Sequence, residues 1–250
     1  MATVHSTHDS PHVSVSRDVD ALMTAAALRV ATLCREAIKR HGRFNWVLAG
    51  GNTPRQLYSL LAQPPFVSNL DWPQVEFFWG DERCVPPDHP DSNFRMARET
   101  LLNVVQPDPA RVHRMRGEDP PNAAAADYEA ELQHSFGLHA GTAPPSFDLI
   151  LLGMGADGHT ASLFPHSPTL RETQRWVTFD PAAARLTLTR PVLNAGTHVL
   201  FLVSGANKAA RLKHVLAGPD EGLPAQRIRP AHGQLEWLVD AAAAAGLEAP

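Results

Sequence analysis

Four mostly apolar runs along the chain each lead directly into a turn of glycine and polar residues. Short apolar runs of this kind are typical of strands that are buried on both faces of a parallel sheet. The runs cover residues 43–48, 75–79, 147–152 and 197–203. Helical spacing precedes the first run and recurs between the runs, most clearly over 17–41, where apolar residues recur every three or four positions until Gly42. Alternating strands and helices predict an α/β fold with a mostly parallel sheet flanked by helices.

Weaker patterns predict the remaining elements. Alternation of apolar and polar residues over 176–179 and 185–189 predicts two strands with one solvent-facing side. A further strand is expected at 112–115, and helices are expected at 55–61, 93–102, 122–132, 209–216 and 235–246. The polar residues 1–16 predict a flexible tail. Because no linker divides the rest, a single α/β domain is expected over 17–250.

The four turns are expected to lie together, because the carboxyl ends of parallel strands share one edge of a sheet. The turn at 50–53 leads into a helix with Pro54 near its start, and free backbone N–H groups there predict an anion site. Arg83 and Lys208 follow two other strands and add the cations of a phosphate clamp. Alone, the 50–53 turn also fits a plain strand-to-helix connection. The predicted substrate-binding residues are Gly50, Gly51, Asn52, Thr53, Asp81, Arg83, Gly155 and Lys208.

The turn after the third apolar run carries the candidate chemistry. Its glycines over 153–158 allow a close approach of the backbone to a ligand, and His159 follows at once. Imidazole exchanges protons near neutral pH, so we expect His159 to be a general base that Asp157 orients. Taken alone, His159 fits a surface or capping position better than a functional one, because the chain has 13 histidines and most of them have no role in chemistry. The three other turns favour the functional interpretation, since functional side chains gather at such strand ends.

Composition narrows the classes of function. The net charge of −4 and the absence of a long basic stretch argue against a nucleic-acid partner. Cys34 and Cys84 have no zinc-finger spacing, and His159, His166 and Asp157 match no strong ligand motif, so no metal is expected. No secretory signal and no apolar run of membrane-spanning length is visible. We therefore expect a cytoplasmic protein with no membrane partner.

Taken together, the turns resemble those of a known family. The similar stretches are Leu-Ala-Gly-Gly-Asn-Thr-Pro (48–54), Trp-Gly-Asp-Glu-Arg (79–83), Ser-Asn (92–93), Gly-Met-Gly-Ala-Asp-Gly-His-Thr-Ala-Ser-Leu-Phe-Pro (153–165) and Ser-Gly-Ala-Asn-Lys (204–208). They resemble the soluble α/β type of 6-phosphogluconolactonase, which is related to glucosamine-6-phosphate deaminase. The resemblance spans about residues 20–240 in the family's order, and the stretch from Asp157 to Pro165 is its most specific part.

The resemblance implies a modified doubly wound, Rossmann-like fold. It also implies hydrolysis of 6-phospho-D-glucono-1,5-lactone to 6-phospho-D-gluconate in the oxidative pentose phosphate pathway, without a cofactor. His159 would be the general base, and Arg83 and Lys208 would hold the phosphate. N–H groups of the 153–158 turn are expected to meet the charge that develops on the lactone carbonyl oxygen. The expected partner is this small phosphosugar lactone, with a monomer or a small homo-oligomer as the assembly.

Two alternatives remain open. A sugar-phosphate isomerase or deaminase of the same fold needs a carboxylate base, and Asp81 or Glu82 can fill that role. A non-catalytic sugar-phosphate sensor that regulates transcription carries a DNA-binding module, but only about 16 residues precede the first predicted helix. The lactonase therefore stays the preferred interpretation.

Overall fold

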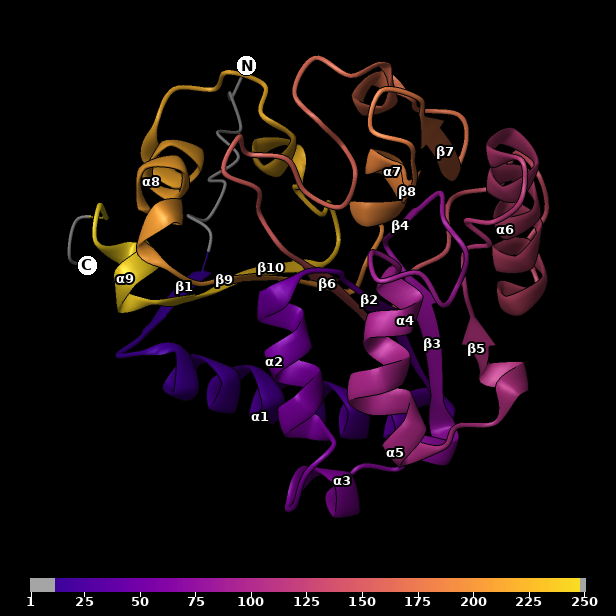
Figure 1. Ribbon diagram of the computed structural model, residues 1–250, viewed down its shortest axis with the longest axis horizontal. Coiled ribbons are helices and arrows are strands. Elements are labelled where there is room, and N and C mark those ends of the chain that lie inside the picture. Colours follow the sequence, from indigo (N-terminus) through magenta and orange to yellow (C-terminus); the bar gives the residue numbers. More distant parts are fainter. Residues whose placement is uncertain (1–11, 248–250) are drawn as a thin grey trace, which may run out of the picture.

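A seven-stranded parallel sheet forms the centre of the protein (Figure 1). The computed structural model describes residues 12–247. The strand order is β1-β10-β9-β6-β2-β3-β5, and every neighbouring pair is parallel. The strands are β1 (His12–Ser16), β2 (Phe44–Leu48), β3 (Val75–Trp79), β5 (Val112–His113), β6 (Leu149–Leu152), β9 (His198–Val203) and β10 (Gln234–Asp240). The predicted α/β class with a mostly parallel sheet is confirmed.

A second, antiparallel sheet of three strands lies beside the carboxyl edge of the first. Its order is β4-β8-β7, with β4 (Asp81–Arg83), β7 (Val177–Asp180) and β8 (Arg185–Leu188). The helices are α1 (Val19–His41), α2 (Asn52–Leu61), α3 (Phe66–Asn69), α4 (Asn93–Ala97), α5 (Asn103–Val105), α6 (Pro121–Phe136), α7 (Arg190–Leu193), α8 (Ala209–Ala217) and α9 (Ala241–Ala244). In Figure 1, α1 and α2 lie below the parallel sheet, and α8 and the small sheet lie above it.

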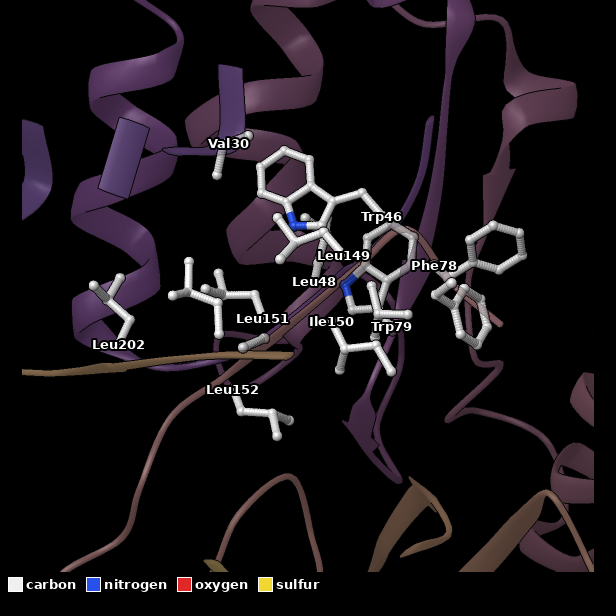
Figure 2. Packing of buried hydrophobic residues seen from close by; sticks show 14 of the residues in the cluster. Val30, Trp46, Leu48, Phe78, Trp79, Leu149, Ile150, Leu151, Leu152 and Leu202 are labelled. Atoms are coloured by element: carbon white, nitrogen blue, oxygen red, sulfur yellow. The ribbon is translucent and has the colours of Figure 1, made fainter. Parts of the chain in front are cut away.

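The central strands are almost entirely apolar because helices or the small sheet cover both of their faces. Every residue of β2 and β6 is buried. Trp46 of β2 packs edge-on against Tyr58 of α2, with ring centroids 5.8 Å apart. Figure 2 shows Trp46 and Leu48 packed with Leu149 and Ile150 in one apolar cluster. These packed strands hold the turns that follow them in fixed positions.

Both ends of the chain depart from the predicted elements. Residues 12–16 form β1 rather than part of a flexible tail, because their backbone pairs with β10 and Val13 packs on the core. Residues 1–11 of the expected tail lie outside the described residues. The helix predicted over 235–246 is wrong, since 234–240 form β10 and only 241–244 are helical. The ring of Trp237 in β10 stacks on the ring of Phe201, with centroids 3.8 Å apart. The burial of Trp237 against Phe201 outweighs the helix preference of the alanines that follow.

Other predicted elements shift at their ends. The helix predicted over 55–61 begins three residues earlier, at Asn52, and Gly51 occupies the capping position with φ of 99°. The helix predicted over 93–102 changes to a π-helical turn at 98–102. The strand β8 was expected to have one solvent-facing side, but three of its four residues are buried because α6 packs over it.

A buried carboxylate fixes the starts of the two central strands. Asp148, directly before β6, accepts hydrogen bonds from the backbone and side-chain amides of Asn45 at 2.9 and 3.0 Å. Arg40 and His41 at the end of α1 also contact its other oxygen, each at 2.8 Å. The carboxylate therefore joins α1, β2 and β6 at the sheet edge opposite the four turns.

His113 forms a clamp between two carboxylates at the β5 edge of the sheet. His113 of β5 contacts Glu131 of α6 through Nδ1 at 2.6 Å and Glu76 of β3 through Nε2 at 3.0 Å. Partial burial lowers the pKa of His113, but the hydrogen bonds and charges of the two carboxylates outweigh it and raise the pKa above its usual range. The imidazolium form therefore holds β3, β5 and α6 together.

Candidate active site

One cleft collects the four predicted turns. The strands β9, β6, β2 and β3 are consecutive neighbours in the sheet, so their carboxyl ends meet at one edge. The cleft has a volume of about 240 Å³, and its lining includes every predicted site residue except Asp157. The predicted residues that line it are Gly50, Gly51, Asn52, Thr53, Asp81, Arg83, Gly155, His159 and Lys208. The sequence prediction of a shared strand-end pocket is confirmed in its geometry.

The glycine turn after β2 offers free backbone donors to the cleft. Helix α2 begins at Asn52 and no side chain of the described residues caps it, so its first N–H groups have no helical partner. Gly50 has no room for a side chain, since a Cβ there would lie 1.9 Å from Asn93 Oδ1. The hydroxyls of Thr53 and Ser204 are 3.0 Å apart and link this turn to the one after β9. The turn thus has the features of an anion site.

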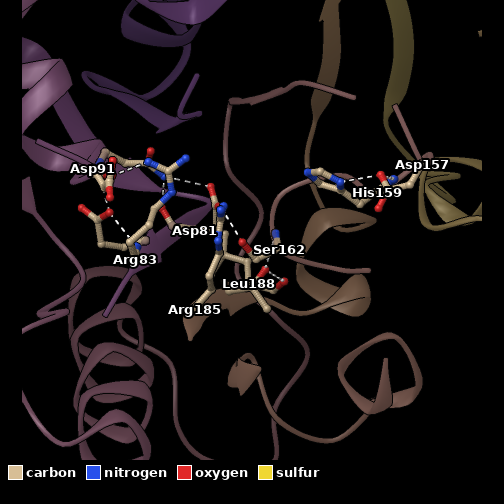
Figure 3. Close-up of polar contacts among 11 residues, drawn as sticks. Asp81, Arg83, Asp91, Asp157, His159, Ser162, Arg185 and Leu188 are labelled. Atoms are coloured by element: carbon tan, nitrogen blue, oxygen red, sulfur yellow. Dashed lines mark hydrogen bonds and ion pairs between the residues drawn. The ribbon is translucent and has the colours of Figure 1, made fainter. Parts of the chain in front are cut away.

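Three cations line the cleft. Arg83 of β4 donates a hydrogen bond through Nη1 to the Asp91 carbonyl, and its buried Nε has no partner among residues 12–247. Lys208 has no ion-pair partner within residues 12–247. The Arg185 guanidinium lies 3.8 Å from the Asp81 carboxylate. Both side chains are labelled in Figure 3. Three positive charges against one carboxylate make the cleft locally positive in an acidic chain.

His159 and Asp157 form a hydrogen-bonded pair at the rim. Asp157 Oδ1 lies 2.6 Å from His159 Nδ1 and also accepts the His159 backbone N–H at 3.1 Å (Figure 3). Partial burial raises the pKa of Asp157, but the His159 contacts outweigh it and hold the pKa below its usual range. In the neutral imidazole whose Nδ1 donates to Asp157, Nε2 carries the lone pair. Nε2 has no hydrogen-bond partner in the described part of the chain.

The imidazole is held on two further sides. A Cβ at Gly155 would lie 2.1 Å from His159 Nδ1 and 2.6 Å from Asp157 Oδ1, so the pair rests directly on the glycine backbone. The Phe164 ring packs on the imidazole with centroids 4.6 Å apart. The Arg185 guanidinium lies 5.9 Å from the centre of the same phenyl ring. The ring of His159 is therefore fixed in orientation before any ligand arrives.

Two of the N–H groups expected to stabilise a developing oxyanion are already used. The Gly155 N–H donates to the His159 carbonyl at 2.8 Å, and the Gly158 N–H donates to the Gly155 carbonyl at 3.1 Å. Arg211 of α8 donates to the Ala156 carbonyl at 3.1 Å and holds the same turn. The glycines of 153–158 therefore serve mainly to shape the turn under His159.

The two carboxylates after β3 are occupied by protein donors. Glu82 is 2% exposed and accepts hydrogen bonds from Ser92 Oγ and from the backbone N–H groups of Asn93 and Phe94 at the start of α4. Burial raises the pKa of Glu82, and these hydrogen bonds oppose the rise. Asp81 is also buried and accepts a 2.6 Å hydrogen bond from Ser162 Oγ. Both carboxylates are therefore engaged by donors from the protein itself.

Asn93 and Arg185 line the cleft although neither is among the predicted site residues. Asn93 is 1% exposed and donates to the Asp81 carbonyl at 2.9 Å, and its buried Oδ1 has no partner in the described part of the chain. Its position in the Ser-Asn stretch at 92–93 was the available signal. Arg185 comes from the alternating strand β8, and nothing in that pattern indicates that the strand pairs with β4 beside the cleft.

No helix within residues 12–247 is long and apolar enough to cross a membrane. The same residues contain no group of three His, Cys, Asp or Glu side chains that could hold a metal ion.

The fold and the cleft define an α/β protein with a strand-end site for a small anionic ligand. The chain belongs to the family described as glucosamine-6-phosphate isomerases/6-phosphogluconolactonase, whose sequence profile matches residues 17–237. It is 42% identical over 240 residues to a 6-phosphogluconolactonase of Nostoc sp., covering 94% of this chain and 98% of the relative. It is 38% identical to a 6-phosphogluconolactonase of Streptomyces coelicolor, and the match covers 96% of this chain and 95% of the relative.

Solved structures show the same fold. The 6-phosphogluconolactonase from Trypanosoma cruzi superposes with a TM-score of 0.85 at 28% identity, covering 99% of this chain and all of that one. The Thermotoga maritima 6-phosphogluconolactonase gives a TM-score of 0.79 at 32% identity, and the superposition covers 92% of this chain and 99% of that one. A monomeric glucosamine-6-phosphate deaminase, at 22% identity and a TM-score of 0.77, shares the fold. The expected doubly wound, Rossmann-like architecture is confirmed.

Proposed function

We propose that the protein hydrolyses 6-phospho-D-glucono-1,5-lactone to 6-phospho-D-gluconate, the lactonase step of the oxidative pentose phosphate pathway. The observation that carries this proposal is the free Nε2 of His159 at the rim of a cleft lined by Arg83, Arg185 and Lys208. A base and a cluster of cations fit a substrate with a hydrolysable centre at one end and a phosphate at the other. The relatives named 6-phosphogluconolactonase support this assignment.

The proposed chemistry begins at His159 Nε2. Nε2 takes a proton from a water molecule while the water oxygen attacks C1 of the lactone. Asp157 stabilises the imidazolium that forms and keeps Nε2 directed outward, through its contact with Nδ1. The proton then passes to the ring oxygen as the C1–O bond breaks, which leaves the 6-phosphogluconate carboxylic acid. General-base assistance of this kind contributes about 10²- to 10⁴-fold to the rate.

The phosphate of the substrate is placed among the cations and the glycine turn. Arg83 offers a planar fork of donors and Lys208 offers a mobile point charge. The N–H groups at the start of α2 complete the anion site, with Gly50 and Gly51 keeping that backbone open to the cleft. Neither a metal nor an organic cofactor is part of this proposal.

The compartment and the assembly are also proposals. Cys34 and Cys84 are both free thiols, which fits a reducing compartment such as the cytoplasm. The proposed ligand is a small phosphosugar, and neither nucleic acid nor a membrane is a proposed partner. A monomer or a small homo-oligomer is sufficient, because all residues proposed for the reaction come from one chain.

The deaminase alternative is disfavoured by the carboxylates after β3. A deaminase needs a carboxylate that removes a proton next to C2 of an amino sugar. Glu82 accepts hydrogen bonds at the start of α4, and Asp81 accepts the Ser162 hydroxyl. Both are therefore committed to structure in this protein.

Stopped-flow hydrolysis of freshly prepared 6-phosphogluconolactone tests the proposal. The rate must be corrected for spontaneous hydrolysis, since the lactone also opens unaided. We expect saturable acceleration and no ammonia release from glucosamine 6-phosphate. A rate equal to the spontaneous one would contradict the lactonase assignment, and ammonia release would favour the deaminase.

A further inference from the structure

The loop that carries His159 is fastened to the small sheet through one fully buried serine. Ser162, three residues after His159, donates a 2.6 Å hydrogen bond from Oγ to Asp81 Oδ2 of β4. Its backbone N–H donates to Thr187 Oγ1 of β8 at 3.2 Å. Asp81 and Thr187 are directly paired in the antiparallel β4–β8 register, so Ser162 is bonded to both members of one residue pair. Figure 3 shows Ser162 beside Asp81, with His159 and Asp157 farther along the same loop.

Asp81 is better suited to this contact than to binding phosphate. Its Oδ1 accepts a hydrogen bond from Asn93 Nδ2 at 3.2 Å, and its Oδ2 accepts the Ser162 hydroxyl. Arg185 Nη1 lies 3.8 Å away and balances part of its charge. A carboxylate repels a phosphate, whereas a hydroxyl that donates to a buried carboxylate forms a short and strong hydrogen bond. Asp81 thus acts as the fixed acceptor for Ser162.

The segment between His159 and Ser162 is short and has little freedom. Thr160 is fully buried and donates through Oγ1 to the Gly153 carbonyl at 2.8 Å. Ala161 has a positive φ of 46°, a conformation that a residue with a side chain adopts only where neighbouring contacts hold it. A shift of Ser162 is therefore transmitted to the imidazole of His159 rather than absorbed between them.

We propose that Ser162 is a positioning residue, which sets the His159 imidazole against the lactone carbonyl by anchoring the 159–162 loop to Asp81 and Thr187. This inference rests on the proposed lactonase function. Ser162 itself does not line the cleft, so it acts through His159 and not by touching substrate. A misplacement of about 1 Å at a reacting group can cost about 10²-fold in rate, so this anchor affects turnover more than substrate affinity.

The variant Ser162→Ala tests this role with Thr189→Val as its matched control. Thr189 is equally buried, and its hydroxyl donates one 2.7 Å hydrogen bond to the Arg175 carbonyl, away from the cleft. We expect Ser162→Ala to lower kcat about 10- to 100-fold with KM changed less than about twofold. Thr189→Val should leave both constants within about twofold. Equal kcat losses in the two variants, or an unchanged kcat in Ser162→Ala, would overturn the proposal.

A second pair of variants tests the other attachment point. Thr187→Val removes the acceptor of the Ser162 N–H, whereas Thr187→Ser keeps it. We expect a kcat loss in Thr187→Val that Thr187→Ser restores to at least half of the wild-type value. If Thr187→Val and Thr187→Ser behave alike, the attachment to β8 has no positioning role.

Amide hydrogen exchange separates this inference from the proposed function, because it needs no substrate. Amides of residues 159–164 should exchange faster in Ser162→Ala than in the wild type and Thr189→Val. If the wild type lacks lactonase activity, the proposed function fails while this comparison still decides whether Ser162 holds the loop. Unchanged exchange over 159–164 would overturn the positioning role in either case.

Discussion

The variant Gly155→Ala should displace the His159–Asp157 pair without disturbing the backbone. Gly155 does not have a positive φ, so alanine is compatible with its conformation. The added Cβ would lie 2.1 Å from His159 Nδ1 and 2.6 Å from Asp157 Oδ1, where carbon contacts normally need about 3.5 Å or more. The imidazole must therefore move by more than about 1 Å.

A displacement of this size has a calculable cost. Misplacing a catalytic group by about 1 Å lowers a rate by about 10²-fold, which corresponds to about 2.7 kcal/mol of activation free energy. We expect kcat to fall by about that factor. KM should change little, because the cations of Arg83 and Lys208 stay in place.

Gly153→Ala is the matched control for this variant. A Cβ at Gly153 meets no atom of the described residues within 4 Å, so the His159 ring should stay where it is. Because Gly153 lines the cleft, this control is judged on kcat and not on KM. Stopped-flow kinetics corrected for spontaneous hydrolysis should give kcat within about threefold of the wild type for Gly153→Ala. Full activity of Gly155→Ala, or an equal loss in Gly153→Ala, would refute the argument that Gly155 supports the pair.

Three further predictions follow from the structure. Arg83→Ala and Lys208→Ala should each raise KM about 10-fold or more in steady-state kinetics with a smaller effect on kcat, because phosphate contacts are made equally in the ground and transition states. Asp148→Ala should lower the free energy of unfolding in urea by about 3 kcal/mol, since four donors around a buried carboxylate lose their acceptor, while kcat of the folded protein stays unchanged. The raised pKa of His113 means that its clamp stabilises fully below the unfolded-chain pKa of about 6.5 and loses that contribution as the pH rises through the higher folded value. His113→Gln should therefore flatten the decline of unfolding free energy above about pH 6.5, and an unchanged pH profile would contradict the clamp.

The site was predictable where it depends on local sequence and one general rule. The four apolar runs predict buried strands, and parallel strands put their carboxyl ends together. That rule brings Gly51, Arg83, His159 and Lys208 to one cleft, as the structure shows. The pairing of Asp157 with His159 follows from a separation of only two residues in a tight turn.

Residues that reach the cleft through long-range pairing were not predictable. Arg185 faces Arg83 across the β4–β8 pair, more than 100 positions away, and no local pattern encodes that pairing. The burial of Ser162 under Asp81 depends on the same pairing. The strand β10 was missed because its tertiary burial against Phe201 outweighs the helix preference of the alanines after it.

The general-base role of His159 is the central claim, and His159→Ala tests it most directly. His139→Ala is a suitable control, because His139 is an exposed histidine outside the cleft. In stopped-flow hydrolysis corrected for the spontaneous rate, His159→Ala should lose about 10²- to 10⁴-fold in kcat while its unfolding transition stays that of a folded protein. His139→Ala should keep the wild-type kcat. A saturable rate in His159→Ala equal to that of the wild type would contradict the account.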